Sequence, residues 1–137
     1  MQVSFTVIGE PKGKQRPRVV HTGGRTMTYT PGQTVMYENL VRYSYMEQVG
    51  RVKLKAPVKA DITAVFPIPK SVSKKQRERM TAGEVLHTKK ADSDNIAKAI
   101  LDSVNKIAYD DDAGVAVLTV RKVYGETPRV DVTLTEI

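Results

Sequence analysis

Three aspartates in the second half of the chain have the type and spacing to share a divalent cation. Asp92 and Asp94 lie two residues apart where a stretch of helical periodicity begins, and Asp112 lies in a loop after that stretch. Magnesium prefers hard oxygen ligands and keeps several of its waters, so a few carboxylates are enough to bind it. A cation held in this way can polarise a phosphate ester and activate a water molecule for its hydrolysis. These residues therefore predict metal-dependent cleavage of a phosphodiester.

A structural explanation exists for each of these residues taken alone. Aspartate is a common N-cap, and an acid near a helix N-terminus complements the helix dipole. Lys98, one turn after Asp94, could neutralise a phosphate or form an ordinary ion pair with Asp94. Local spacing favours the structural explanation for Lys98 and for an isolated pair of acids. Three adjacent carboxylates at 110–112 repel one another unless a cation relieves them, which makes the whole set harder to explain by capping.

Charge is distributed unevenly along the chain, whose net charge is +7. Residues 1–60 carry ten Lys or Arg against three Glu, whereas residues 61–137 carry twelve residues of each sign. Residues 92–112 alone hold six Asp and two Lys, so an acidic cluster lies within a basic protein. A basic surface attracts polyanions such as nucleic acid, although it can equally serve only to keep a protein in solution.

Length and composition narrow the class of protein. The 137 residues suit one domain that spans 1–137. The absence of cysteine excludes disulfides, thiolate zinc sites and thiol nucleophiles, and it fits a reducing cytoplasm. The first ten residues lack the basic start and apolar run of a secretory signal, and no apolar stretch approaches the roughly 20 residues that span a bilayer. We expect a cytoplasmic protein with no membrane partner.

Hydrophobic periodicity predicts the elements that must position the acids. It predicts strands at 3–7, 58–66, 115–120 and 130–134, helices at 34–49 and 94–106, a basic hairpin at 17–30, and a short basic helix at 71–80 capped by Ser71 or Ser73. The last two strands are expected to form an antiparallel hairpin. This order predicts an α+β fold with a mixed or mainly antiparallel sheet packed against two main helices.

Apolar residues at helical spacing support both predicted helices. Met36, Leu40 and Tyr43 recur at helical spacing in the first helix, as Ile96 and Ile100 do in the second. The second helix would be about 20 Å long, so no local geometry brings residue 112 to its start. The strand that begins near residue 115 must therefore run beside the segment that leads into residue 92.

At these residues the sequence resembles the RusA family of Holliday junction resolvases, especially the RusA-like proteins of bacteriophages and prophages. The main matches are Asp92-Ser-Asp94-Asn95-Ile-Ala-Lys98-Ala-Ile-Leu-Asp102 and Tyr109-Asp-Asp111-Asp112-Ala-Gly-Val115. Further matches are Gly9-Glu-Pro-Lys-Gly-Lys-Gln-Arg16-Pro-Arg18, Tyr29-Thr-Pro31, Phe66-Pro-Ile-Pro69, His87-Thr-Lys-Lys, Arg121-Lys122 and Pro128-Arg-Val130. Each piece alone is weak, but the combination is specific and extends over nearly the whole chain.

The resemblance implies a homodimer that cuts four-way DNA junctions by paired nicks in recombination and repair, with magnesium or manganese as cofactor. It implies that Asp92, Asp94 and Asp112 bind the metal and that Lys98 is catalytic, which reverses the structural explanation given above for the lysine. The setting would be a bacterial or phage-infected bacterial cell. Two basic segments, 12–18 and 70–79, then become the expected DNA-contacting surface, with Lys12, Lys14, Arg16, Arg18, Lys74, Lys75 and Arg77 as its cations.

Several alternatives stay open at this point. Asp110 adds a third acid to the usual pair, so Asp111 could replace Asp112 as the metal ligand. The N-terminal basic segment departs from the family pattern, which leaves selectivity for junctions over flaps, forks or RNA undecided. A non-catalytic DNA-binding module would also explain the net charge, and it predicts salt-sensitive binding without nicking.

Overall fold

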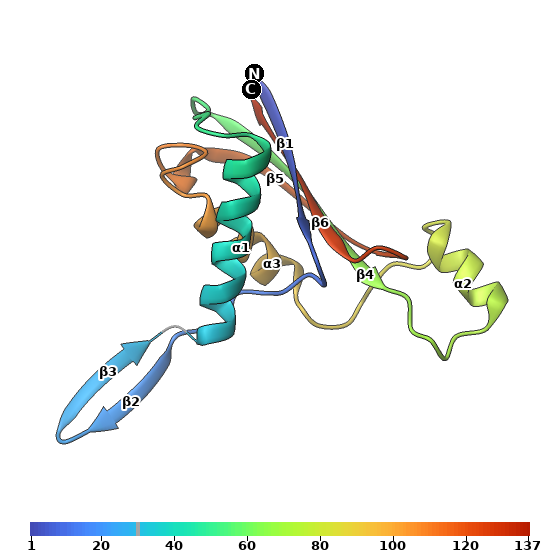
Figure 1. The fold of residues 1–137 in the computed structure, drawn as a ribbon, viewed down its shortest axis with the longest axis horizontal. Helices are drawn as coiled ribbons and strands as arrows, with labels where there is room; N and C mark the ends of the chain where they lie inside the picture. The colour runs from blue at the N-terminus through green and yellow to red at the C-terminus, as the bar shows by residue number, and fades with distance from the viewer. Residues whose placement is uncertain (30) are drawn as a thin grey trace.

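The computed structural model describes residues 1–29 and 31–137 and shows an α+β fold, which confirms the predicted class. The elements follow one another as drawn in Figure 1: β1 (Gln2–Ile8), β2 (Arg18–Thr22), β3 (Arg25–Tyr29), α1 (Gly32–Gln48), β4 (Val58–Pro67), α2 (Lys74–Thr81), α3 (Ser93–Ser103), the 3₁₀ turn η1 (Asp112–Gly114), β5 (Val115–Gly125) and β6 (Arg129–Glu136). The basic hairpin predicted at 17–30 is confirmed as β2 and β3, while Thr30 lies outside the described residues.

The main sheet has four strands in the order β1-β6-β4-β5. β6 is antiparallel to both β1 and β4, whereas β4 and β5 are parallel, so the sheet is mixed. The prediction that the last two strands form a hairpin is wrong, because β4 lies between them. The short connection from Gly125 to Arg129 passes over the end of β4 at Pro67, which leaves β5 as an edge strand.

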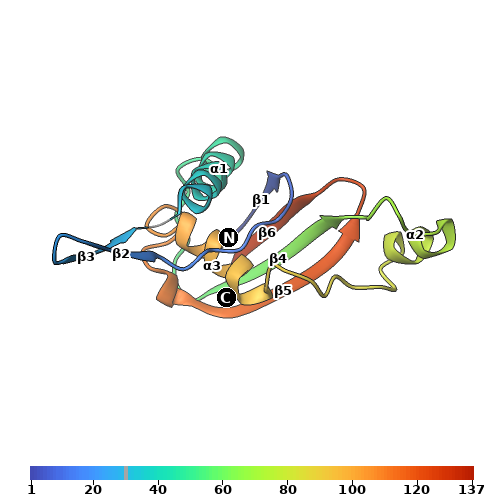
Figure 2. The ribbon, with the colours of Figure 1, turned by 90° about the horizontal axis from the view of Figure 1, so that it is seen from below.

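Helices α1 and α3 pack side by side on one face of this sheet (Figure 2). β4 shows the alternation that this arrangement requires, with Ala60, Ile62 and Ala64 buried toward the helices. The opposite face of the sheet carries polar residues. On that face, the hydroxyl groups of Ser4 on β1 and Thr133 on β6 form a hydrogen bond of 3.0 Å. The core therefore lies between one sheet face and two helices, as the period-two pattern predicts.

The predicted first helix is correct, but the residues whose spacing predicted it do not face the core. The buried residues of α1 are Thr34, Tyr37, Val41, Ser44 and Tyr45. Met36, Leu40 and Tyr43 instead face outward, with exposed fractions of 73%, 40% and 63%. α1 is apolar on two sides, so spacing alone could not decide which side meets the sheet.

The two other helices differ from expectation only at their ends. α3 begins one residue before the predicted start and stops at Ser103 rather than at 106, because the chain turns at Val104. α2 begins after Ser73, whose hydroxyl accepts a hydrogen bond from the Gln76 amide at 3.1 Å, so Ser73 is the N-cap.

Two basic appendages stand at opposite ends of the long axis of the molecule, the β2–β3 hairpin at one end and α2 at the other (Figures 1 and 2). All ten residues of β2 and β3 are exposed. No helix in the described part of the chain combines the length and the apolar character needed to cross a membrane.

Candidate functional site

The start of α3 presents two carboxylates to solvent. Ile96, Ala97 and Ile100 bury one side of the helix in the core, which directs Asp94 and Lys98 outward. Asp92 occupies the N-cap position, and its backbone carbonyl accepts from the Ile96 amide at 3.0 Å. Its side chain makes no capping hydrogen bond to any described residue. Capping therefore does not explain the carboxylate of Asp92.

Lys98 is exposed one turn further along α3. Within residues 1–29 and 31–137, no acidic group lies within ion-pairing distance of its ammonium group. The ordinary ion pair with Asp94 is thus not formed. The lysine charge remains available to an anion that approaches the start of α3.

A second group of acids lies at the other end of α3. The Asp112 amide donates to the Asn105 side-chain carbonyl at 3.1 Å, which holds the loop against the end of the helix. A shared hydrogen bond with Asp111, partial burial and the nearby charges of Asp111 and Asp102 raise the pKa of Asp112. The same hydrogen bond, together with the Ala113 amide, lowers the pKa of Asp111.

Nearby positive charges offset the repulsion between these carboxylates only in part. Asp110 is paired with Lys53 at 3.0 Å, but its side chain is 93% exposed and the pair is worth little in water. Asp111 has Lys106 close enough to lower its pKa, whereas the charges beside Asp112 are acidic. A cation near Asp112 would remove the repulsion within this group.

The structure does not bring the three predicted metal ligands together in one chain. Asp112 lies with Asp102 at the end of α3, a helix about 16 Å long, while Asp92 and Asp94 lie at its start. The loop before α3 does run beside β5, as expected, but it does so at Lys122, near the end of the strand far from Asp112. Among the described residues, no three His, Asp or Glu side chains converge in a manner that could hold a metal ion.

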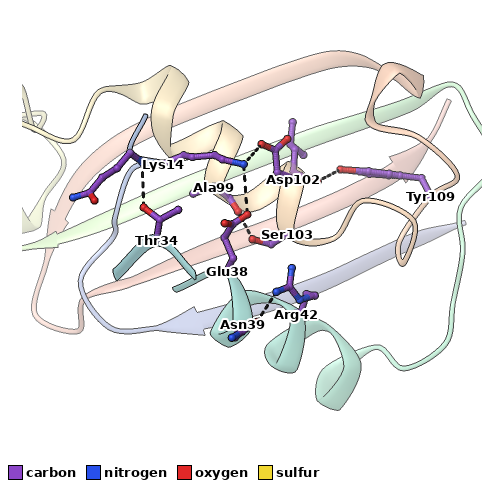
Figure 3. Close-up of polar contacts among 11 residues, drawn as sticks. Lys14, Thr34, Glu38, Asn39, Arg42, Ala99, Asp102, Ser103 and Tyr109 are labelled. Carbon is purple, nitrogen blue, oxygen red and sulfur yellow. Dashed lines mark hydrogen bonds and ion pairs between the residues drawn. The ribbon is translucent and has the colours of Figure 1, made fainter. Parts of the chain in front are cut away.

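The N-terminal basic segment, residues 12–18, is held against α1 and α3 by contacts of Lys14. Lys14 extends from this segment between α1 and α3, where its ammonium group contacts Asp102 at 2.7 Å and Glu38 at 3.6 Å (Figure 3). Its charge is thus offset inside the protein, and the hydrogen bond to Asp102 raises its pKa. The other three predicted cations of the segment, Lys12, Arg16 and Arg18, are exposed.

Glu38 is the residue of this arrangement that sequence reasoning missed. It lies on the half-buried flank of α1 and completes the contact with Lys14. No pattern in the sequence connects a lysine in an irregular segment with a glutamate on the following helix, because the pair depends on how that segment crosses α1 and α3.

The three cations predicted on α2 differ from one another in exposure. Lys74 and Lys75 are exposed, whereas Arg77 is partly buried and donates to the Pro69 carbonyl at 3.3 Å. Because α2 and the β2–β3 hairpin lie at opposite ends of the molecule (Figure 1), basic residues are present at both ends of its long axis.

Fold and site together define a small α+β domain that presents acidic groups on a basic surface, a combination suited to handling a nucleic acid backbone. The profile of the family described as Endodeoxyribonuclease RusA matches residues 9–135, and the chain belongs to this family. The family assignment confirms the resemblance inferred from the motifs. A protein of Bacillus subtilis (strain 168), named Uncharacterized protein YqaN, is 34% identical over 137 residues, which cover 98% of this chain and 96% of that protein.

Proposed function

We propose that the protein is a magnesium-dependent endonuclease that resolves four-way DNA junctions by paired nicks during recombination and repair, in the cytoplasm of a bacterial or phage-infected cell. The observation that carries the proposal is the pair of exposed carboxylates at the start of α3, Asp92 and Asp94, with exposed Lys98 one turn along, in a chain of this family. Manganese would serve as a substitute ion, since it accepts the same oxygen ligands.

The donor set fits a hard divalent cation. Asp92 and Asp94 offer carboxylate oxygens, and magnesium keeps enough waters that two such groups make a starting site. When bound, the ion would polarise the scissile phosphate and lower the pKa of a water molecule. Lys98 would neutralise charge that develops on the phosphate, and the N-terminus of α3 would favour its approach.

The third ligand is proposed to come from a second copy of the chain. Asp112 is assigned this role because it is partly buried among acids and needs a cation, yet it lies away from Asp92 and Asp94 in its own chain. A homodimer also matches the approximate two-fold symmetry of a four-way junction, at which two symmetric nicks need two equal sites. The outward apolar stripe of Met36, Leu40 and Tyr43 supports self-association, since such stripes mark interaction surfaces.

The test is cleavage of an end-labelled synthetic junction with magnesium, with manganese and without metal. Asp94→Asn is expected to lower the nicking rate by more than about 100-fold, since even groups that only orient metal ligands are worth 10- to 100-fold. Junction binding should persist or tighten, because a negative charge next to phosphate is removed. Asp61→Asn, on the polar face of the sheet, is the matched control and should cut normally.

Binding and nicking measured on the same samples separate the alternatives. Salt-sensitive binding by the wild type without nicking in either metal would establish a DNA-binding module and overturn the nuclease proposal. Undiminished cutting by Asp94→Asn would remove this residue from the mechanism. Flaps, forks, duplexes and RNA in the same series determine whether four-way junctions are preferred.

A further inference from the structure

A cavity of about 620 Å³ adjoins the candidate site and shares Asp92 with it. Three segments form its walls: residues 12–18, the first turns of α1, and residues 90–99 at the start of α3. Asp92 and Asn95 lie at its boundary with the candidate site. A volume of this size is in the range of cavities that bind small organic ligands, so a whole nucleotide has room in it.

The walls of the cavity are held by direct contacts. The Lys14 amide donates to the Asn95 carbonyl at 2.9 Å, and the Gln15 amide donates to the Thr34 hydroxyl at 3.3 Å. Gly13 approaches α3 so closely that an added Cβ would lie 2.9 Å from the Cβ of Ala91. The segment is therefore docked on both helices, and the cavity is a built feature of the fold.

The charge around the cavity is strongly positive. Lys12, Arg16, Arg18 and Lys90 line it and are exposed, and none forms an ion pair with a described residue. Asp92 is the one acid among the described residues that line it. The surplus of unpaired cations favours an anionic occupant.

The first turn of α1 adds donors to the same wall. It contains no acidic residue, and no described side chain caps it. Gln33 and Thr34 of this turn line the cavity, so the positive end of a 17-residue helix faces the space. A helix end of this kind does not by itself identify a ligand.

Tyr37 supplies the independent observation. The residue is only 7% exposed and lines the cavity, yet its hydroxyl finds no acceptor among the described residues. Burial raises its pKa to about 12, an effect that the nearby backbone amide of Lys12 partly opposes. The group is therefore a protonated donor at neutral pH. A buried donor without an acceptor costs free energy, and an acceptor-rich ligand would remove that cost.

We propose that this cavity, the anion pocket, binds one nucleotide of a DNA strand through its phosphate, next to the position cut at Asp92. Tyr37, Lys12 and Lys90 are the groups assigned to this phosphate. The inference rests on the proposed function only in naming DNA as the source of the phosphate. Its consequence is that the strand would be held at a second, uncut phosphate, which would fix the register of the scissile one.

The experiment measures binding without divalent metal, so it does not depend on cleavage. The probes are inorganic phosphate, deoxycytidine monophosphate and a single-stranded oligonucleotide without terminal phosphates, titrated calorimetrically at several salt concentrations. The oligonucleotide is expected to bind most tightly. Tyr37→Phe keeps the ring and is expected to fold normally, yet to weaken oligonucleotide binding on the order of tenfold, the scale of one hydrogen bond to a charged group.

Lys90→Gln tests the same phosphate from the surface and guards against a folding defect in Tyr37→Phe. It is expected to lower the slope of log affinity against log salt by about 0.7, the value for one phosphate contact on a single strand. Lys55→Gln is the matched control, since Lys55 is exposed beyond the other end of α1, and its slope should change less.

If Tyr37→Phe and Lys90→Gln both bound the oligonucleotide with the wild-type affinity and the wild-type salt dependence, the proposal would be overturned. Losses no larger than that of Lys55→Gln would overturn it as well, because they would indicate diffuse attraction. Tighter binding of inorganic phosphate or the mononucleotide than of the oligonucleotide would exclude a DNA strand as the occupant. A wild type that binds DNA through Tyr37 but nicks no substrate would refute the proposed function and leave this inference standing.

Discussion

Asp111 and Asp112 are neighbours in sequence but differ in environment. Asp112 is partly buried and anchored through Asn105, whereas Asp111 is exposed at the surface. We predict that Asp112→Asn lowers single-turnover nicking by more than about 100-fold while junction binding persists, and that Asp111→Asn costs about tenfold at most, the lower end of the effect of an outer group. Circular dichroism of both variants checks that the loop still folds. The opposite ranking would assign the ligand to Asp111.

His87 makes the stability of the protein depend on pH. Its ring lies flat on Phe66 with centroids 3.6 Å apart, and burial together with the charges of Lys122 and Lys89 lowers its pKa. The unfolded chain therefore takes up a proton near pH 6.5 that the folded protein resists. Stability from this group is complete above that pH and declines as pH falls toward the lower folded pKa.

The corresponding prediction concerns urea unfolding between about pH 7.5 and about pH 5.5, on either side of the ordinary histidine pKa. The wild-type midpoint should fall over this range, and His87→Phe should show a smaller fall because the ring stack remains without a titrating group. His21→Phe, in the exposed hairpin, should fall as the wild type does. Equal falls in His87→Phe and the wild type would contradict the assignment.

At the scale of elements, the docking of residues 12–15 on α3 depends on a missing side chain. A Cβ on Gly13 would lie 2.9 Å from Ala91 Cβ and 3.0 Å from Asn95 Cβ, and neither atom can move without shifting its backbone. We predict that Gly13→Ala costs about 1–3 kcal/mol of unfolding free energy, as overpacking usually does. Thermal unfolding and junction nicking should both suffer.

Gly32→Ala is the control for that substitution. Gly32 begins α1, and its added Cβ would meet no atom within 4 Å. Its stability should be unchanged or slightly raised, since alanine favours helix more than glycine does. A Gly13→Ala variant as stable as Gly32→Ala would show that the segment is not tightly docked.

Sequence patterns predicted the helices and strands better than they predicted which of these elements lie side by side. The alternation in β4 and the serine before α2 predicted both elements closely, because each signal is local. The sheet order was beyond reach, since alternation reports which face of a strand is buried and not which strand lies beside it. The same limit applies to α1, which is apolar on two sides: the spacing of Met36, Leu40 and Tyr43 predicts a helix but not that these residues are exposed.

In the candidate site, too, local spacing identified some residues, whereas the placement of others depends on tertiary structure. Motif spacing identified Asp92, Asp94 and Lys98, and the structure leaves all three exposed, Asp92 at the N-cap of α3 and the other two on that helix. Where Asp112 lies depends on the turn after α3, and the ion pair of Lys14 depends on how an irregular segment crosses two helices. Both are tertiary facts that no local pattern encodes.

At the scale of the whole molecule, a site shared between two copies can be tested by mixing inactive proteins. Asp94→Asn and Asp112→Asn should each fail to nick alone. In a mixed dimer, one site would combine both defects, while the other would combine an intact Asp92–Asp94 pair with an intact Asp112. We predict that refolding the two variants together restores single nicks but not paired ones, as measured by strand-specific labels on one junction.

Two further measurements complete this test. Sedimentation should find the wild type as a dimer at the concentrations that cut DNA. Mixing Asp92→Asn with Asp94→Asn is the negative control, since both changes affect the same half of the shared site. No activity from the first mixture, in samples shown to contain mixed dimers, would place each site within a single chain.

The pairing of β1 with β6 has a consequence for how the chain acquires its shape during synthesis. β1 pairs only with β6 among the described strands, and Ser4 meets Thr133 across 129 positions of sequence. β1 therefore leaves the ribosome before β6 has been synthesised. It can pair only after nearly the whole chain has been made. Long-range contacts of this kind slow folding and leave strand edges open to other chains. Nascent chains that stall before β6 should thus be the form most dependent on chaperones.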